Sequence, residues 1–179
     1  MLSRDRRWRA TDLVGVALLL ALAAVIGYVE GTLVAPLPVP GLRLGLANVA
    51  VIIALARFGP RAAAFVSLGR VFLVALAAGT LAGPTFLLSL AGACASLVVM
   101  IALASAGPMF SVIGWSLAGS AVHVIAQLCV ASLLAATSAP LALVPVALAL
   151  SVPLGYAVGF LARLLLSRIP DWSLSAAGR

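Results

Sequence analysis

Long apolar runs separated by short breaks rich in glycine and proline dominate the sequence. A helix needs roughly 20 apolar residues to cross about 30 Å of hydrocarbon, and the breaks at Gly59-Pro60 and Gly107-Pro108 are typical helix interruptions. The pattern predicts an all-α bundle of six transmembrane helices, at about residues 13–34, 44 to the Gly59-Pro60 break, 61–78, 85–105, 110–136 and 140–166. The chain then divides into a basic cytoplasmic leader (1–12), one six-helix transmembrane domain (13–168) and a cytoplasmic tail (169–179).

The first and the sixth of these runs have features that affect their interpretation. The first also fits a signal peptide, because arginines precede it and small residues stand near 21–23. It continues to about Val34, which is long enough to cross a bilayer, so a retained first span is favoured. In the sixth run, Pro145 and Pro153 are expected to kink the helix.

Composition and charge place the chain in a membrane. Hydrophobic residues make up 65% and charged residues 8% of 179 positions, whereas soluble domains have about 25% charged residues. The net charge of +7 comes from eleven arginines and no lysine. Such a balance can indicate nucleic acid binding, but four arginines precede an apolar run, which favours a membrane protein. Cys94 and Cys129 lie inside apolar runs and are interpreted as small buried hydrophobic residues.

The arginines predict the orientation. Only Arg43 falls in a connection on the outer side, and Arg70 lies in the middle of the third run. The other nine fall on the opposite side, at positions 4, 6, 7, 9, 57, 61, 163, 168 and 179. Loops rich in arginine stay in the cytoplasm. Both termini are therefore expected in the cytoplasm of a multi-pass protein of the cell's inner (plasma) membrane.

The stretch from Glu30 to Asn48 carries much of the polar chemistry. Three prolines at positions 36, 38 and 40 fix φ and remove backbone donors, so residues 35–41 should run extended. Glu30 stands near the end of the first apolar run, and Asn48 stands just inside the second. We expect a stiff outer connection that covers a binding site, with Arg43 on it.

Further polar residues lie at similar depth in other helices. An ionisable group near the membrane midplane costs on the order of 3 kcal/mol and needs a partner or a wet cavity. Arg70 and His123 reach the midplane by residue count, and Gln127 shares the His123 face one turn further out. Glu30, Asn48, Arg70, His123 and Gln127 should therefore converge in the outer half of the bundle. They are expected either to line a solute pocket or to fix helix packing, with Glu30 paired to Arg70 or Arg43.

Small residues in the first run suggest a docking face. Ala17 and Ala21, and then Ala23, Gly27 and Gly31, stand at four-residue spacing that lets another helix approach closely. The approaching helix could be internal or could belong to a partner.

Missing motifs argue against enzyme activity. The chain has no GxxxxGK[ST] loop for a nucleotide. All three aspartates lie in the first twelve residues or the tail, which leaves no pair to hold magnesium against a diphosphate. The single histidine has no cysteine or carboxylate at ligand spacing. We expect no catalytic residues, no metal and no cofactor.

Several segments resemble the Gx transporter family, which is also labelled heptaprenyl diphosphate synthase component I. They are Glu30 with residues 36–49, the segment 68–80 around Arg70, the SLAG at 89–92, and residues 116–128. The family pattern His-Asn-x-Gly-Gln in the fifth helix reads His-Val-Ile-Ala-Gln at 123–127, which keeps the histidine and the glutamine.

That family is similar to the substrate-binding S components of energy-coupling factor vitamin transporters. The resemblance implies six membrane helices, capture of a solute from the outer side, and docking of a coupling membrane protein and ATPase subunits through the alanine face of helix one. It also implies a vitamin-like solute, related to flavins or to isoprenoids and quinones. The competing hypothesis is an accessory membrane subunit of a redox or prenyl-lipid synthesis complex, in which the polar residues are structural.

Overall fold

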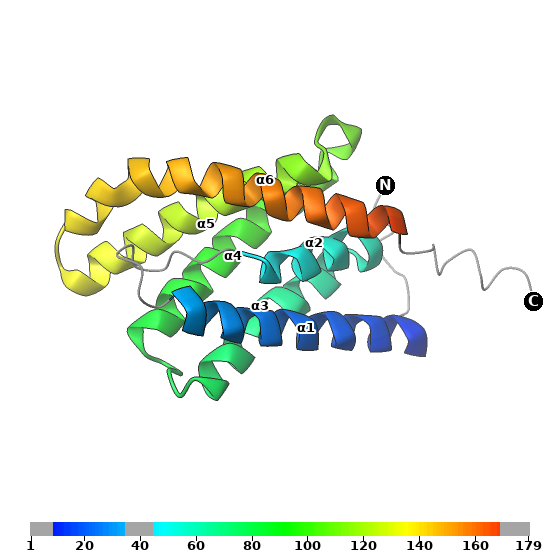
Figure 1. Ribbon diagram of the computed structural model, residues 1–179, viewed down its shortest axis with the longest axis horizontal. Coiled ribbons are helices and arrows are strands. Elements are labelled where there is room, and N and C mark those ends of the chain that lie inside the picture. The colour runs from blue at the N-terminus through cyan, green and yellow to red at the C-terminus, as the bar shows by residue number, and fades with distance from the viewer. Residues whose placement is uncertain (1–8, 35–44, 169–179) are drawn as a thin grey trace, which may run out of the picture.

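The computed structural model describes residues 9–34 and 45–168, and every regular element in these ranges is a helix. The elements are α1 (Ala10–Val34), α2 (Ala47–Phe58), α3 (Pro60–Ala77), α4 (Pro84–Ser105), the 3-10 helix η1 (Gly107–Met109), α5 (Val112–Ala135), the 3-10 helix η2 (Ala139–Leu143) and α6 (Val144–Arg168). Figure 1 shows the longer helices running side by side along the bundle. The expected all-helical bundle is confirmed for the described residues. The leader up to residue 8, the three prolines, Arg43 and the tail from 169 onward lie outside them.

The second helix is shorter than the sequence predicted. Five helices, α1, α3, α4, α5 and η2 with α6, are long and apolar enough to cross a membrane. By contrast, α2 has 12 residues, about 18 Å at a rise of 1.5 Å per residue, which is less than the hydrocarbon thickness. It begins only after Gly45, whose φ of 78° ends any earlier helical path. The expected second helix is therefore present, beginning at Ala47 rather than near residue 44, but six full membrane spans are not confirmed.

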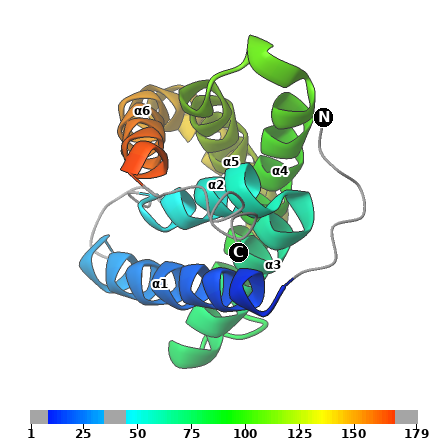
Figure 2. The same ribbon diagram turned by 90° about the vertical axis from the view of Figure 1, so that its right-hand side faces the viewer.

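This short helix forms the centre of the bundle. Figure 2 shows α2 between α1, α3 and α6, and it packs against all three. Ala47 and the seven residues 49–55 are buried. On the outer helices large apolar side chains face outward, such as Leu18 at 66% and Leu133 at 78% exposure. Apolar surface on both the inside and the outside is what a lipid-embedded bundle requires.

Two glycines in α6 allow α5 to approach closely. A Cβ atom on Gly159 would lie 2.8 Å from the Cα atom of Ile113, and one on Gly155 would lie 2.5 Å from Ser120 Oγ. The Ser116 hydroxyl donates a hydrogen bond of 2.7 Å to the Gly155 carbonyl across the same contact. This Gly-x-x-x-Gly pair, which the sequence analysis did not single out, is the small-residue packing typical of membrane helices.

The small residues of α1 divide between two environments. Ala23 and Gly27 are buried, and a Cβ atom on Gly27 would lie 3.3 Å from Val74 of α3. Ala17 and Ala21 are exposed on the outer face of α1. The internal docking face is therefore centred on Ala23 and Gly27. A role for Ala17 and Ala21 in contacts with a partner stays a prediction.

Two further expectations need correction. Cys94 and Cys129 are both exposed, because they stand on the outer faces of α4 and α5, where apolar sequence also faces lipid. Pro145 lies in the first turn of α6, where its missing N–H has no intrahelical acceptor to lose, so it does not kink the helix. Pro153 does lie inside α6, as expected.

Arginines gather at one end of the bundle. The start of α1, the α2–α3 junction and the end of α6 lie together at the right in Figure 1, and they carry Arg9, Arg57, Arg61, Arg163 and Arg168. The Arg57 guanidinium donates a hydrogen bond of 2.9 Å to the carbonyl of Leu166, near the end of α6. The opposite end contains the end of α1, the start of α2, and the α3–α4 and α5–α6 turns. The membrane side that each end faces stays a prediction.

A matched pair of glycine substitutions tests the α5–α6 contact. Gly159→Ala should lower the free energy of unfolding by about 1–3 kcal/mol, because its methyl group would collide with the α5 backbone. Gly31→Ala introduces the same methyl group with nothing within 4 Å and should leave stability unchanged or raise it by up to about 1 kcal/mol. Thermal unfolding of both purified variants in detergent measures the difference, and equal stability would contradict the contact.

Single cysteines test the orientation. In a background with Cys94 and Cys129 changed to alanine, Leu81→Cys in the α3–α4 turn should react with an impermeant maleimide on intact cells. Ala106→Cys, at the arginine-rich end, should react only after the cells are permeabilised. The reverse pattern would place the arginine-rich end outside, against the charge rule.

Candidate functional site

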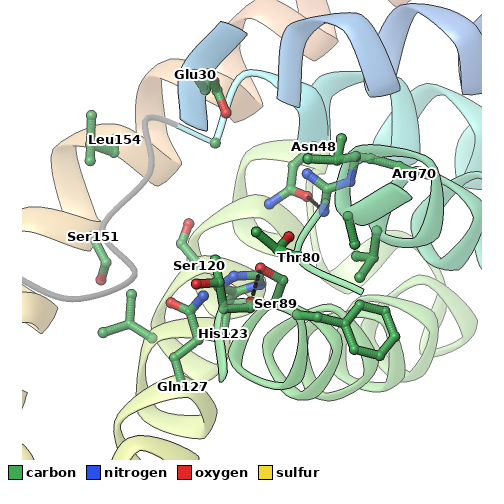
Figure 3. Close-up of a pocket in the computed structure, with 17 residues that line it drawn as sticks. Glu30, Asn48, Arg70, Thr80, Ser89, Ser120, His123, Gln127, Ser151 and Leu154 are labelled. Carbon is green, nitrogen blue, oxygen red and sulfur yellow. Dashed lines mark hydrogen bonds between the residues drawn. The ribbon is translucent and has the colours of Figure 1, made fainter. Parts of the chain in front are cut away.

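All six helices contribute to the lining of a pocket, which includes Glu30 near the end of α1, Gly45 before α2 and Thr80 in the α3–α4 turn. These segments lie away from the arginine-rich end of the bundle. The pocket encloses about 60 Å³, which is room for a few water-sized groups. One part of the wall is apolar, with Val71, Val74, Phe86, Val124 and Leu154. The remainder is polar, and Figure 3 shows these side chains pointing toward a common centre.

The structure brings together the polar residues that the sequence singled out. Glu30 of α1, Asn48 of α2, Arg70 of α3, and His123 and Gln127 of α5 all line this pocket. Arg43, the sixth candidate, lies outside the described residues. The expected convergence is therefore observed for five of the six, while their contact with a solute stays a prediction.

Glu30 holds the beginning of α2. Its side chain is 3% exposed, and its Oε1 atom accepts a hydrogen bond of 2.6 Å from the backbone N–H of Leu46, the residue before α2. The first N–H groups of a helix have no intrahelical acceptor. A negative charge beside them also interacts favourably with the positive end of the helix dipole. Glu30 is the carboxylate of α1 beyond its first turn. It thus stabilises α2, a helix that starts part-way along the bundle.

Arg70 is held by the same short helix. Its Nη2 atom donates a hydrogen bond of 3.0 Å to Asn48 Oδ1, and its side chain is 7% exposed. Gly27 of α1 lies beside it, and even a Cβ atom there would make only ordinary van der Waals contact with Arg70 Cδ, at 3.8 Å. Each charged residue of the pocket therefore has a neutral polar partner on or beside α2. A direct pairing of Glu30 with Arg70 stays a prediction.

His123 occupies a slot that Gly92 provides. A Cβ atom on Gly92 would lie 2.7 Å from His123 Nε2, so any larger residue at this position of α4 would displace the imidazole. The sequence analysis missed this role of Gly92. A glycine within an apolar helix was the available signal, because it lowers helix propensity and so suggests a packing or functional reason.

Gln127 presents a side-chain amide to the pocket. Its side chain is 3% exposed, and within residues 9–34 and 45–168 it makes no hydrogen bond. Figure 3 shows its amide beside His123, directed from α5 toward the cavity. The sequence placed Gln127 on the His123 face, and the structure agrees.

Hydroxyl groups complete the polar wall, and sequence reasoning did not find them. The residues are Thr80, Thr85, Ser89, Ser120 and Ser151. Ser89, Ser120 and Ser151 donate to carbonyls of their own helices, at 2.8 to 3.0 Å, so their oxygens can still accept. Serine and threonine are common in membrane helices, and nothing in the pattern distinguishes these five from the others.

Comparison with known proteins places the chain in a family. A family model described as heptaprenyl diphosphate synthase component I matches residues 19–165 of the 179. The chain belongs to this family. The matched range includes all five polar candidates of the pocket and covers α1 from residue 19 onward. No curated protein and no solved structure matches the chain.

The pocket combines several kinds of polar group with an apolar wall. It presents one carboxylate, one guanidinium, one imidazole, two amides and several hydroxyls, next to an apolar wall. A concave site with a few converging polar groups on an apolar background is typical of small-molecule binding.

The Glu30 contact generates a stability prediction. Glu30→Ala should lower the free energy of unfolding by about 1.5–3 kcal/mol, because the Leu46 N–H loses a charged acceptor in a dry environment. Glu30→Gln keeps an acceptor oxygen and should lose less than half as much. Thr32→Val serves as the control, because that exposed hydroxyl only bonds the Val29 carbonyl of its own helix. Unfolding of the detergent-purified variants measures all three, and equal losses for Glu30→Ala and Glu30→Gln would contradict the capping role.

Proposed function

We propose that the chain is the solute-binding component of a membrane transporter, similar to energy-coupling factor S components. The observation that carries this proposal is the pocket to which all six helices contribute, with five polar side chains converging from α1, α2, α3 and α5. Residues used only to fix helix packing would be expected in separate pairs. Here they surround one cavity.

The position of the pocket supports capture from the outer side. The pocket lies at the end away from Arg57, Arg61, Arg163 and Arg168, and arginine-rich ends stay in the cytoplasm. The proline-containing connection 35–44, which is outside the described residues, is proposed to be on the outer side of the membrane. The solute is proposed to be small and vitamin-like, related to flavins or to isoprenoids and quinones, as the family resemblance implies.

Transport requires an energy source, and we assign it to partners. Ala17 and Ala21 are exposed on α1, where small side chains would let a helix of a coupling membrane protein approach closely. ATPase subunits would act on that coupling protein.

The family description favours a second candidate, an accessory membrane subunit of a prenyl-lipid synthesis complex. In that case the pocket residues would stabilise the bundle, and the outer face of α1 would hold the partner. We do not propose catalysis by this chain itself, because the carboxylate of the pocket is already bonded to the Leu46 N–H.

Solute retention distinguishes the two candidates. The protein is purified after mild solubilisation, and bound small molecules are extracted and identified by mass spectrometry. His123→Ala and Gln127→Ala should each lower retention by at least about tenfold while stability changes by no more than about 1–2 kcal/mol, since polar contacts between membrane helices average about 0.6 kcal/mol. Asn48→Ala should lower retention as much and should also cost about 1.5–3 kcal/mol of stability, because it removes the acceptor of the Arg70 guanidinium. Ser96→Ala, a buried α4 residue that bonds Ala93 of its own helix, is the control.

The subunit hypothesis predicts another pattern. Any bound solute would survive all three alanine substitutions, and Ala17→Leu or Ala21→Leu would remove a stoichiometric partner from the purified complex. Full retention in the three pocket variants would refute solute binding at this site.

A further inference from the structure

The charged groups of the pocket balance each other. Of the described residues that line it, only Glu30 and Arg70 carry a formal charge, apart from the histidine. Glu30 is bonded to the Leu46 N–H and Arg70 to the Asn48 side chain. Among the described residues of the lining, a solute group with two or more negative charges, such as a diphosphate, would face one guanidinium, which is already bonded to Asn48, and one carboxylate that repels it. Burying such an uncompensated charge is strongly unfavourable.

Among the described residues of the lining, Gln127 offers neutral hydrogen-bonding groups to the cavity. A primary amide has one carbonyl acceptor and two N–H donors side by side. The Gln127 amide is not among the fully buried polar atoms without a partner, so it is open to the cavity and can bond a group placed there. Gln127 is 3% exposed, lines the cavity and makes no hydrogen bond within the described residues.

The surroundings of Gln127 match a small neutral group. The hydroxyls of Ser120 and Ser151 lie on the same cavity and can accept hydrogen bonds. The neighbouring wall contains Val124 and Leu154, which suit an apolar ring or chain. The 60 Å³ that the pocket encloses has room for one such group of a few atoms.

We infer that the solute presents a neutral planar edge with an adjacent donor and acceptor, as in a lactam, an imide or a primary amide, and that Gln127 binds this edge. A complementary amide pair satisfies both Gln127 functions at once, which neither a carboxylate nor a phosphate can do because each offers acceptors only. The inference rests on the proposed solute-binding function and specifies the chemical class that the site selects.

Four small probes of similar size test this selectivity. The purified protein in lipid nanodiscs is titrated with thymine and nicotinamide, which carry an imide and an amide edge, and with benzoate and phenyl phosphate, which carry anions. Binding is measured by ligand-detected NMR. The neutral probes should bind at least tenfold more tightly than the anions. Gln127→Leu should weaken the neutral probes at least tenfold, whereas Ser96→Ala, outside the pocket, should not change their binding.

Gln127→Glu provides a second variant of nearly identical shape. It replaces the donor with an acceptor, so it too should weaken thymine at least tenfold even if Gln127→Leu folds poorly. Tighter binding of benzoate or phenyl phosphate than of the neutral probes would overturn the inference. So would neutral binding that both Gln127 variants retain.

The co-purified solute separates this inference from the function on which it rests. An extracted solute that carries an anion and lacks an amide-type edge would overturn the inference and leave solute binding standing. If no solute is extracted and none of the four probes binds, both the inference and the proposed function fail.

Discussion

The central helix begins inside the bundle, and its first backbone N–H groups must be satisfied there. Lipid cannot supply acceptors at such a place, so the protein supplies one itself. Glu30 of α1 does this for Leu46, at 2.6 Å. The bond also joins the end of α1 to the start of α2. It thereby positions Asn48, two residues further along α2, where its side chain holds Arg70. The positions of Glu30 and Arg70 in the pocket are thus both linked to the start of α2.

Glycines shape the other side. Gly92 leaves the slot in which the His123 imidazole lies, and Gly155 and Gly159 bring α6 onto α5, so that Ser151 and Ser120 can line one cavity. In a membrane, helices gain little from burying apolar surface against one another, and close approach of backbones is a main source of association. The same small residues therefore serve both stability and the geometry of the site.

The family description and the pocket point to different chemistry. A synthase acting on a prenyl diphosphate would need charge to hold the diphosphate, usually through bound magnesium and several carboxylates. The pocket instead balances one carboxylate against one guanidinium and leaves an amide uncommitted. The description can still apply to the chain as a companion of a synthase. For the cavity itself we propose a neutral, partly apolar solute.

The sequence alone determined the class of the protein and most of its helices. Membrane insertion depends on the length and apolarity of a segment, so the bounds of α1, α3, α4 and α5 agree with prediction to within three residues. Polar groups within apolar runs are costly, and this singled out the five pocket residues before their contacts were known. The tertiary structure alone decided that α2 is short, that Cys94 and Cys129 face outward, and which serines reach the cavity. These features depend on how the helices pack, and a sequence that is apolar on every face does not record which face packs inward.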